Sequence, residues 1–278
     1  MATQTLVRPS SASPETNVRI TPSKADNWQQ CACRYSFQEL INRQQRGSEY
    51  SFRLAFGNAS HAMFAGLNGA ILGGSVLPGA EEGLSQHWND SHFQCDEDVS
   101  DARERALPML QRYFDHLTVN HLTVQACERF VETPRMRIND RLRVTLSGKI
   151  DVVLEAQDGT IFIEDYKTGL LPTRDAFERL LSTTIYQLLG RLLYPEAPRI
   201  VVGQLQPVIG MHVSTTLTQE LVAAARHEIK AMATAIASYP PATDDNFPAV
   251  PGEYCSWCPA RQTHCPVYKD IAGEEEAF

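Results

Sequence analysis

The middle of the chain alternates apolar and polar residues with the period of two that is typical of β-strands. Four such segments follow one another, and residues 157–159 (Gln-Asp-Gly) between the last two favour a tight turn. We therefore predict a meander of four strands and one or two more strands in residues 199–214. The four segments are 129–138, 141–148, 149–156 and 160–168.

Apolar residues recur at helical spacing on both sides of this meander. Pro108 lies inside one of these segments, where we expect a kink because proline cannot donate the helical hydrogen bond. The order of the elements predicts an α/β fold in which helices flank a central mixed sheet. The predicted helices begin near Ser23 and Asn58 and cover residues 102–117, 175–194 and 217–239.

The length and composition allow one large domain or two small ones outside the membrane, and the order of the elements favours a single domain. The 278 residues are 43% hydrophobic, which is enough to bury a full core. No apolar run approaches the ~20 residues that span a bilayer, and the N-terminus lacks the apolar middle of a signal peptide. We expect a soluble, cytoplasmic protein with no membrane partner. Residues 1–20, rich in Ser, Thr and Pro, are predicted to be a disordered tail, which leaves residues 21–278 as a single domain.

Two neighbouring predicted strands carry charged side chains near their ends. If the hairpin is in simple register about Asp158, Asp151 lies opposite Asp165, with β-carbons ~5 Å apart. A divalent cation such as Mg²⁺ or Mn²⁺ would remove the repulsion between the two carboxylates. Lys167 follows on the same strand face, whereas Glu164 is expected to point to the other face and be structural. The alternative is an exposed hairpin whose acids are solvated.

These residues resemble a known family. The segments "GKIDVV" (148–153) and "IEDYKTG" (163–169) are similar to the core of the PD-(D/E)XK nucleases, in particular the RecB-type and CRISPR-associated iron–sulfur exonucleases. "GNASH" (57–61) resembles the upstream motif of the family, and Glu128 fits the acid that opens the meander. The resemblance covers roughly residues 21–268 and implies a restriction-endonuclease-like fold.

The resemblance also implies a catalytic site. His61, Asp151, Asp165 and the backbone carbonyl of Tyr166 would hold Mg²⁺ or Mn²⁺. Lys167 would orient the attacking water and offset the charge that develops on the phosphate. The other histidines lack a comparable context, and we interpret them as ordinary: His87, His92, His116, His121, His212 and His227.

The implied substrate is DNA, either single-stranded or at duplex ends. Gln187 fits the DNA-contacting glutamine on the helix after the catalytic strand. Arg191 replaces the tyrosine expected four residues later, where it would contact a phosphate. The net charge of −8 does not by itself indicate nucleic acid, although it allows a local basic surface.

The cysteines predict a metal site. Seven cysteines, an odd number, argue against a disulfide framework. Three of them, Cys255, Cys258 and Cys265, have the spacing of metal ligands. The fourth ligand must lie elsewhere, with Cys31 and Cys33 as the candidates. The spacing alone leaves open whether the site binds zinc, completed by Cys31 or His264, or an iron–sulfur cluster.

The resemblance decides between these metals. It implies a [4Fe-4S] cluster held by Cys31, with Cys33 as the second choice, and by the three late cysteines. Such a cluster would clasp the N-terminal segment to residues 255–265 and act structurally. Cys95 and Cys127 are interpreted as ordinary thiols.

Two other classes of protein remain open at this stage. One is a non-catalytic DNA-binding scaffold subunit on a degenerate nuclease fold, and the other is a zinc-stapled protein of different function. The presence of Asp151, Asp165 and Lys167 together favours a nuclease. Within the family, recombination or repair (including phage-encoded systems) and CRISPR adaptation use the same core. No GxxxxGK[ST] motif occurs, so any unwinding of DNA would need a partner.

Overall fold

The computed structural model describes residues 15–41, 50–239, 247–261 and 263–268. Within them, seven strands form the mixed sheet predicted from the sequence, in the order β1-β4-β5-β6-β7, with β2 and β3 also paired to β4. β1 runs parallel to β4 and β5 runs parallel to β6, while the other pairs are antiparallel. The strands are β1 (Thr16–Ile20), β2 (Thr123–Glu132), β3 (Met136–Arg137), β4 (Leu142–Glu155), β5 (Ile161–Tyr166), β6 (Ile200–Gln206) and β7 (Met211–Thr215).

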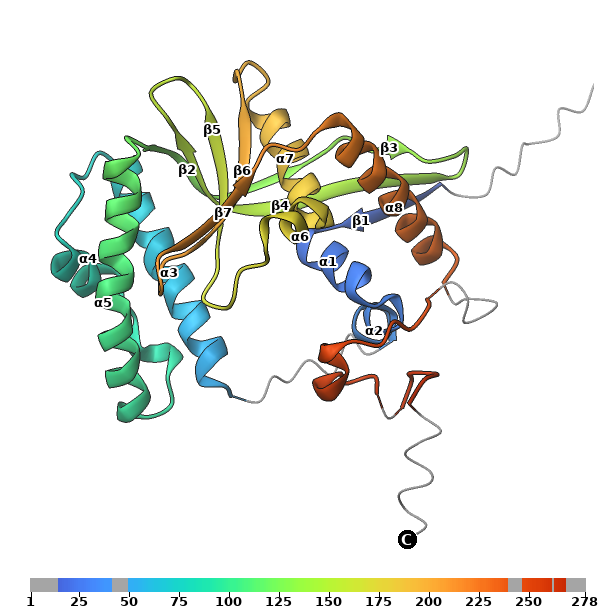
Figure 1. Cartoon of the computed structure of the whole chain (residues 1–278), viewed down its shortest axis with the longest axis horizontal. Helices are drawn as coiled ribbons and strands as arrows, with labels where there is room; N and C mark the ends of the chain where they lie inside the picture. The colour runs from blue at the N-terminus through green and yellow to red at the C-terminus, as the bar shows by residue number, and fades with distance from the viewer. Residues whose placement is uncertain (1–14, 42–49, 240–246, 262, 269–278) are drawn as a thin grey trace, which may run out of the picture.

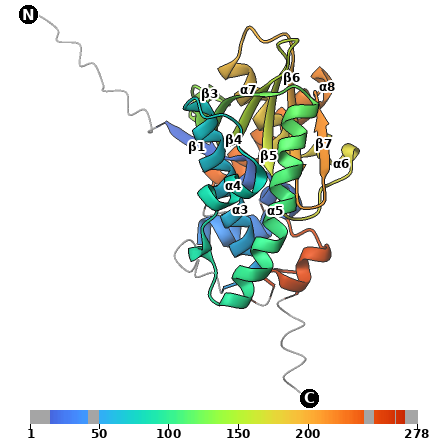
Figure 2. The same cartoon turned by 90° about the vertical axis from the view of Figure 1, so that its left-hand side faces the viewer.

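Helices cover both faces of this sheet (Figures 1 and 2). α3, α4 and α5 pack on one face with β4 and β5, whereas α1, α7 and α8 pack on the other. The helices are α1 (Pro22–Gln30), α2 (Ala32–Ser36), α3 (Phe52–Leu72), α4 (Ala80–His87), α5 (Asp96–Val119), α6 (Arg174–Arg179), α7 (Leu181–Leu193) and α8 (Gln219–Ala237), with short turns η1 (Phe37–Ile41), η2 (Asp90–His92) and η4 (Glu253–Trp257).

β4 is one strand of 14 residues where two strands were expected. Its first part pairs with β1 and its last part with β5, while β2 pairs along much of its length. Gly148, near its centre, faces side chains of both α1 and α7. A β-carbon there would come within 3.1 Å of Leu189 and 3.3 Å of Pro22. The missing side chain of Gly148 therefore leaves room for α1 and α7 to pack on β4, and the glycine does not end the strand.

The prediction of a disordered tail is wrong for Thr16–Ile20, which form β1. Val18 and Ile20 are buried there, because their side chains face the core beside β4. Residues 1–14 of the predicted tail lie outside the described residues, as do residues 269–278 of the predicted domain.

Two predicted helices are each divided in the structure. Cys31 has an extended backbone (φ −166°, ψ 110°) and separates α1 from α2. Leu180 separates α6 from α7 in the same way, with φ −65° and ψ 134°. The period of apolar residues continues through both breaks, so it did not reveal them.

The α5 helix contains Pro108, as expected from the sequence. Within the described residues, no helix combines the length and apolar character needed to cross a membrane.

Candidate active site

The hairpin brings the predicted acids together. Val152 pairs with Glu164 across β4 and β5, so Asp151 and Asp165 are the next residues along the two strands. The backbone N–H of Tyr166 donates to Asp151 Oδ2 over 3.0 Å, and the ammonium group of Lys167 contacts the Asp165 carboxylate. The three charged side chains therefore lie at one end of the hairpin pairing.

His61 reaches this group from α3. Its Nδ1 lies 3.4 Å from Asp151 Oδ2, and its ring packs edge-on against Tyr166. Gly57, one turn earlier, faces the segment after β5, where a β-carbon would make an ordinary contact with Thr168 Oγ1 at 3.4 Å. The glycine-to-histidine motif thus lies where α3 packs against the end of β5.

Burial and mutual repulsion set the electrostatics of the site. Burial first, and then the charge of Asp165, raise the pKa of Asp151 from 3.8 to about 7. Burial opposes the charge of Lys167, but the carboxylate of Asp165 outweighs it and raises the pKa of the ammonium group. Burial also lowers the pKa of His61, which favours the neutral imidazole that binds metals. A cation between the acids would relieve the cost of burying them.

The chemistry of these side chains therefore suits a divalent cation, although their ligand atoms would have to move closer together to bind one ion. The ligand atoms of His61, Asp151 and Asp165 do not all lie within 4.8 Å of one another. Asp165 instead contacts Lys167, the cation nearest to it.

Glu128 interrupts the regular conformation of β2 beside these acids. Its φ of 49° lies in the left-handed region, which is uncommon for a residue other than glycine. The register between β2 and β4 places it across from Asp151, and its carboxylate contacts Lys149. The acid expected at the start of the meander is therefore a neighbour of the site.

Two further side chains that the sequence did not indicate lie near the acids. The hydroxyl group of Tyr186, on α7, is 3.5 Å from Asp165 Oδ1. Asp26, on α1, accepts a hydrogen bond from the backbone N–H of Ser182, and burial raises its pKa. The sequence gives one indication of Tyr186, which is its position next to Gln187, and no indication of Asp26.

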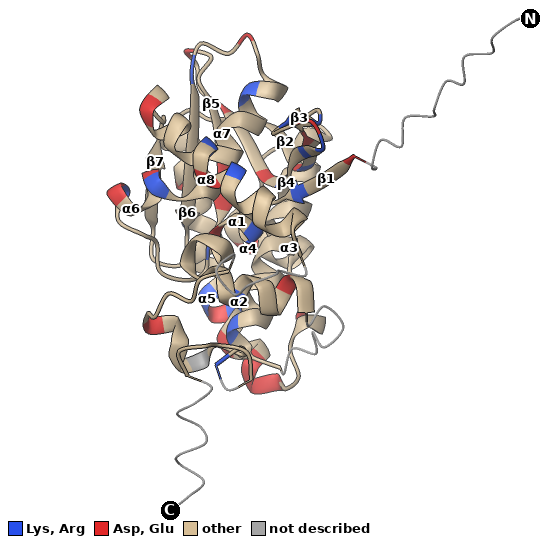
Figure 3. Ribbon diagram, turned by 90° about the vertical axis from the view of Figure 1, so that its right-hand side faces the viewer, with Lys and Arg blue, Asp and Glu red and all other residues tan. Residues whose placement is uncertain are grey.

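A cleft of about 490 Å³ opens beside His61 and Lys167. The guanidinium group of Arg53 lies in it against Gly169, where a β-carbon would come within 2.7 Å of Nη2. In the view of Figure 3, acidic and basic positions are distributed over many elements. Arg53 and Lys167 therefore give the cleft a local positive charge, although the protein as a whole is acidic, as the sequence allowed.

Gln187 and Arg191 lie away from this cleft. The Gln187 amide binds the backbone of Leu217, with Oε1 accepting from its N–H over 2.7 Å. Arg191 donates to the carbonyl of Ala197 over 2.6 Å near the end of α7. Their contact with DNA stays a prediction.

A family model described as the PD-(D/E)XK nuclease superfamily matches residues 19–266. The chain belongs to the PD-(D/E)XK nuclease superfamily. The recognition made from the two strand motifs is confirmed at this level, and the mixed sheet between helices fits a restriction-endonuclease-like core. Nucleases of this superfamily generally use divalent metals, in agreement with the donor set described above.

Two solved structures are weakly similar to this chain. A structure described as "Putative exonuclease" from Eubacterium rectale is 12% identical and has a TM-score of 0.45, covering 78% of this chain and 79% of its own. SSO0001 is 11% identical with a TM-score of 0.35, covering 85% of this chain and 95% of its own. No curated protein is significantly similar in sequence.

The cysteines predicted to be metal ligands lie close together in the structure. The C-terminal segment lies beside α2 (Figure 1), and a shared cavity is lined by Cys31, Cys33, Cys255, Cys258 and Cys265. Cys31 Sγ accepts the backbone N–H groups of Arg34 and Val250, each over 3.5 Å. Burial, together with neighbouring cysteines, raises the pKa of Cys33 to about 12.

His264, the alternative zinc ligand, is engaged elsewhere, since its Nε2 lies 3.3 Å from Ser36 Oγ. Cys95 is exposed and Cys127 is half-buried, and neither lines the cavity.

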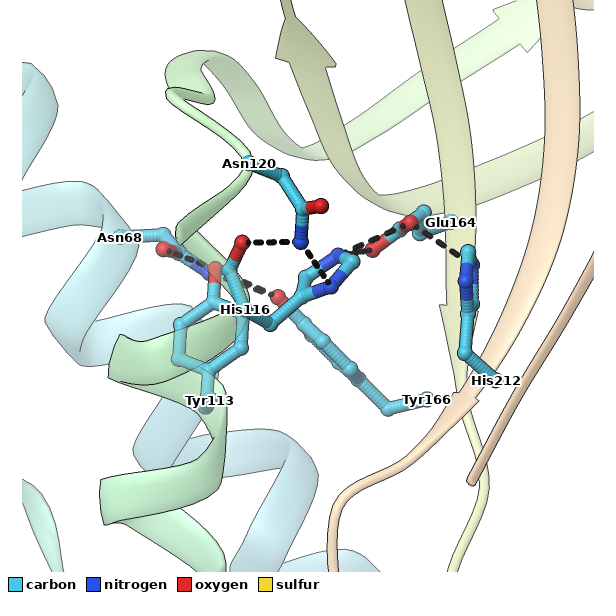
Figure 4. Close-up of polar contacts among 7 residues, drawn as sticks. All are labelled: Asn68, Tyr113, His116, Asn120, Glu164, Tyr166 and His212. Carbon is cyan, nitrogen blue, oxygen red and sulfur yellow. Dashed lines mark hydrogen bonds and ion pairs between the residues drawn. The ribbon is translucent and has the colours of Figure 1, made fainter. Parts of the chain in front are cut away.

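A second polar cluster lies between β5 and α5 (Figure 4). Asn68, Tyr113 and Tyr166 form a closed triangle of hydrogen bonds of 2.7 to 3.0 Å. Beside it, His116 and His212 both contact the carboxylate of Glu164.

His116 and His212, interpreted as ordinary, thus share one buried acid. The two histidines are far apart in sequence, and only the packing of α5 and β7 around β5 brings them to one acid. Glu164 points away from Asp165, as predicted.

Proposed function

We propose that this superfamily member is a metal-dependent deoxyribonuclease that acts as an exonuclease on single-stranded DNA or on duplex ends. The observation that carries this proposal is the meeting of Asp151, Asp165, Lys167 and His61 beside an open cleft. Two strands and one helix supply these groups, so the arrangement depends on the whole fold.

His61, Asp151, Asp165 and the backbone carbonyl of Tyr166 would hold Mg²⁺ or Mn²⁺. When bound, such an ion polarises the scissile phosphate and lowers the pKa of a coordinated water. The N–H of Tyr166 fixes the orientation of Asp151. Lys167, kept protonated by Asp165, places its positive charge next to the acids, where it would orient the attacking water and stabilise charge on the phosphate.

The cleft gives the DNA backbone an approach to these groups. Arg53 would bind a phosphate near Gly169. Gln187 and Arg191 would contact DNA farther from the acids, after release from their present backbone partners. We further propose a cytoplasmic role in recombination, repair or CRISPR adaptation, as in RecB-type and CRISPR-associated exonucleases, with partner proteins from the same pathway.

We also propose a structural [4Fe-4S] cluster held by Cys31, Cys255, Cys258 and Cys265. Two backbone N–H groups point at Cys31 Sγ, which is suitable for a thiolate ligand. The five cysteines that line one cavity support a metal site, and the choice of an iron–sulfur cluster over zinc follows the resemblance to the iron–sulfur exonucleases.

The cluster is tested by anaerobic purification of Cys31→Ser and Cys33→Ser. The first variant is expected to lose the absorbance near 400 nm and the bound iron, while the second keeps both. Colourless wild-type protein with one zinc and no iron would refute the cluster and leave the nuclease proposal intact.

The nuclease activity is tested with Lys167→Ala and Asp165→Ala on end-labelled single-stranded DNA with Mn²⁺. Each change is expected to lower the cleavage rate at least ~100-fold, since each removes a group that stabilises the transition state. The exposed Lys230→Ala and Asp115→Ala provide matched controls. Unchanged cleavage in either site variant overturns the assignment, and wild-type protein that binds the DNA without cutting it would indicate a scaffold.

A further inference from the structure

Three metal-ligating side chains meet on the face of β5 opposite Asp165. Within the part of the chain that is described, only His116, Glu164 and His212 form a group of three whose ligand atoms all lie within 4.8 Å of one another. His116 Nε2 is 3.1 Å from both oxygens of Glu164, and His212 Nε2 is 3.1 Å from Oε1. Figure 4 shows both imidazoles directed at the same carboxylate.

We propose that these three side chains form a Zn²⁺ site, separate from the catalytic acids. Two imidazole nitrogens and one carboxylate oxygen are donors that zinc prefers. Zinc bonds of ~2.0–2.2 Å at a tetrahedral angle place neighbouring ligand atoms ~3.4 Å apart. The observed separations of 3.1 Å need to widen by only a few tenths of an ångström.

The sheet leaves room for this group at one residue. Gly203 of β6 pairs with Glu164 of β5. A β-carbon on Gly203 would come within 2.8 Å of His212 Nε2. Gly203 does not have a positive φ, so its backbone does not require glycine. The missing side chain instead allows the imidazole of His212 to reach across β6 to Glu164.

Burial gives the site a closed inner side and an open outer one. The Glu164 side chain is 0% exposed, His116 is 12% exposed and His212 is 28% exposed. The two imidazoles compensate the buried carboxylate in the metal-free protein, and a divalent ion would supply this compensation while both imidazoles are neutral. The partial exposure of His212 gives the ion access and leaves a fourth position for water.

Asn120 holds His116 from the side away from Glu164. Its side-chain amide nitrogen donates to the backbone carbonyl of His116 over 2.8 Å and lies 3.4 Å from Nδ1. With zinc on Nε2, the proton of the imidazole resides on Nδ1, and the amide keeps its bond to the carbonyl alone.

Zinc at this site would join α5, β5 and β7 through one ion. β5 also carries Asp165, whose side chain lies on the other face of the strand. The site is therefore a positioning device for the strand, and its existence does not depend on the proposed nuclease activity.

The test compares zinc bound by the full-length wild type, His212→Gln and the control His227→Gln, which replaces an exposed histidine of α8. Each protein is equilibrated with ZnCl₂ and desalted, and its metal content is measured by mass spectrometry. Zinc at the acids or cysteines affects all three proteins equally. The wild type and His227→Gln are expected to retain one zinc per chain more than His212→Gln, and zinc is expected to raise the melting temperature of the first two only.

Crystals of the wild type soaked in ZnCl₂ give a second readout that does not depend on any variant being folded. An anomalous peak at the zinc edge between His116, Glu164 and His212 is expected. Equal zinc content in the wild type and His212→Gln, or the absence of this peak, overturns the proposal and leaves the group as a hydrogen-bonded network.

Discussion

Glu164 and Asp165 are adjacent residues of β5, yet their side chains lie in opposite surroundings. Glu164 is fully buried between two imidazoles, and although burial alone would raise its pKa, the hydrogen bonds from His116 and His212 lower it to about 2. On the other face, Asp165 helps to raise the pKa of Asp151 to about 7. β5 therefore carries a satisfied acid on one face and, on the other, one member of a repelling pair whose second member, Asp151, lies on β4.

This difference distinguishes polar groups that stabilise the fold from those proposed to be catalytic. An acid with good partners contributes to folding, whereas acids crowded together reduce stability in the absence of a cation. His61 and Lys167, which contact the crowded acids, also line the cleft. Unfavourable electrostatics beside an open cleft thus indicates function more strongly than the number of charged residues does.

The largest effect is expected from Asp151→Asn. Cleavage of DNA should fall ~10³-fold, because the amide is a poor ligand for a divalent ion. In chelator-treated protein at pH 8, the free energy of unfolding should rise by ~1–3 kcal/mol, since the amide removes a buried, repelled charge. Urea unfolding measures the second effect, with the exposed Asp115→Asn as the control.

The pH dependence of the free energy of unfolding, measured on chelator-treated wild type and Asp151→Asn, tests the direction of this effect. The folded-state pKa of Asp151 lies above its usual 3.8, so the folded chain binds more protons between pH 4 and 7. Its contribution to stability therefore declines as pH rises through this range. If Asp151→Asn and the wild type show the same pH profile, the repulsion between the acids is not as described.

Glu164→Gln is expected to have the opposite effect on stability. It leaves the two partly buried imidazoles without their anion, which should cost ~2–4 kcal/mol in metal-free protein near pH 7. The Glu164 pKa of about 2 lies below its usual 4.5, so the contribution of this acid is complete above pH 4.5 and is lost as pH falls toward 2. Urea unfolding compares it with the exposed Glu104→Gln, and a loss no larger than that of the control would contradict the description.

The smallest effect is expected from Gly203→Ala. The new β-carbon displaces His212 from Glu164 and should lower the free energy of unfolding by ~1 kcal/mol. Gly69→Ala, on α3 with nothing within 4 Å of the added atom, is the control and should stabilise by ~0.5–1 kcal/mol through helix propensity. Thermal unfolding of both variants gives the comparison, and a shift in the same direction would refute it.

The face that carries the proposed catalytic acids could be predicted from the sequence because its geometry is local. The turn at residues 157–159 fixes the register of one hairpin, and alternation then decides which side chains share a face. The register between Val152 and Glu164 agrees with that prediction. His61 required the motif, because α3 lies far from the hairpin in sequence.

The opposite face could not be predicted in this way. His116 and His212 lie on α5 and β7, and nothing near either residue in sequence distinguishes it from a surface histidine. β1 was missed for a related reason. The Ser- and Pro-rich segment before it outweighed the alternation of Val18 and Ile20, whose burial depends on pairing with a strand more than a hundred residues away.

The length of β4 has a consequence for how the protein unfolds. The strand forms a wall of both hydrophobic cores, so neither core can open without exposing one of its faces or edges. An exposed, apolar strand edge pairs readily with another copy of the chain. Thermal denaturation should therefore end in aggregation and be poorly reversible even at low protein concentration. The residues that would be uncovered include Val144, Leu146, Ile150, Val152, Val153 and Leu154.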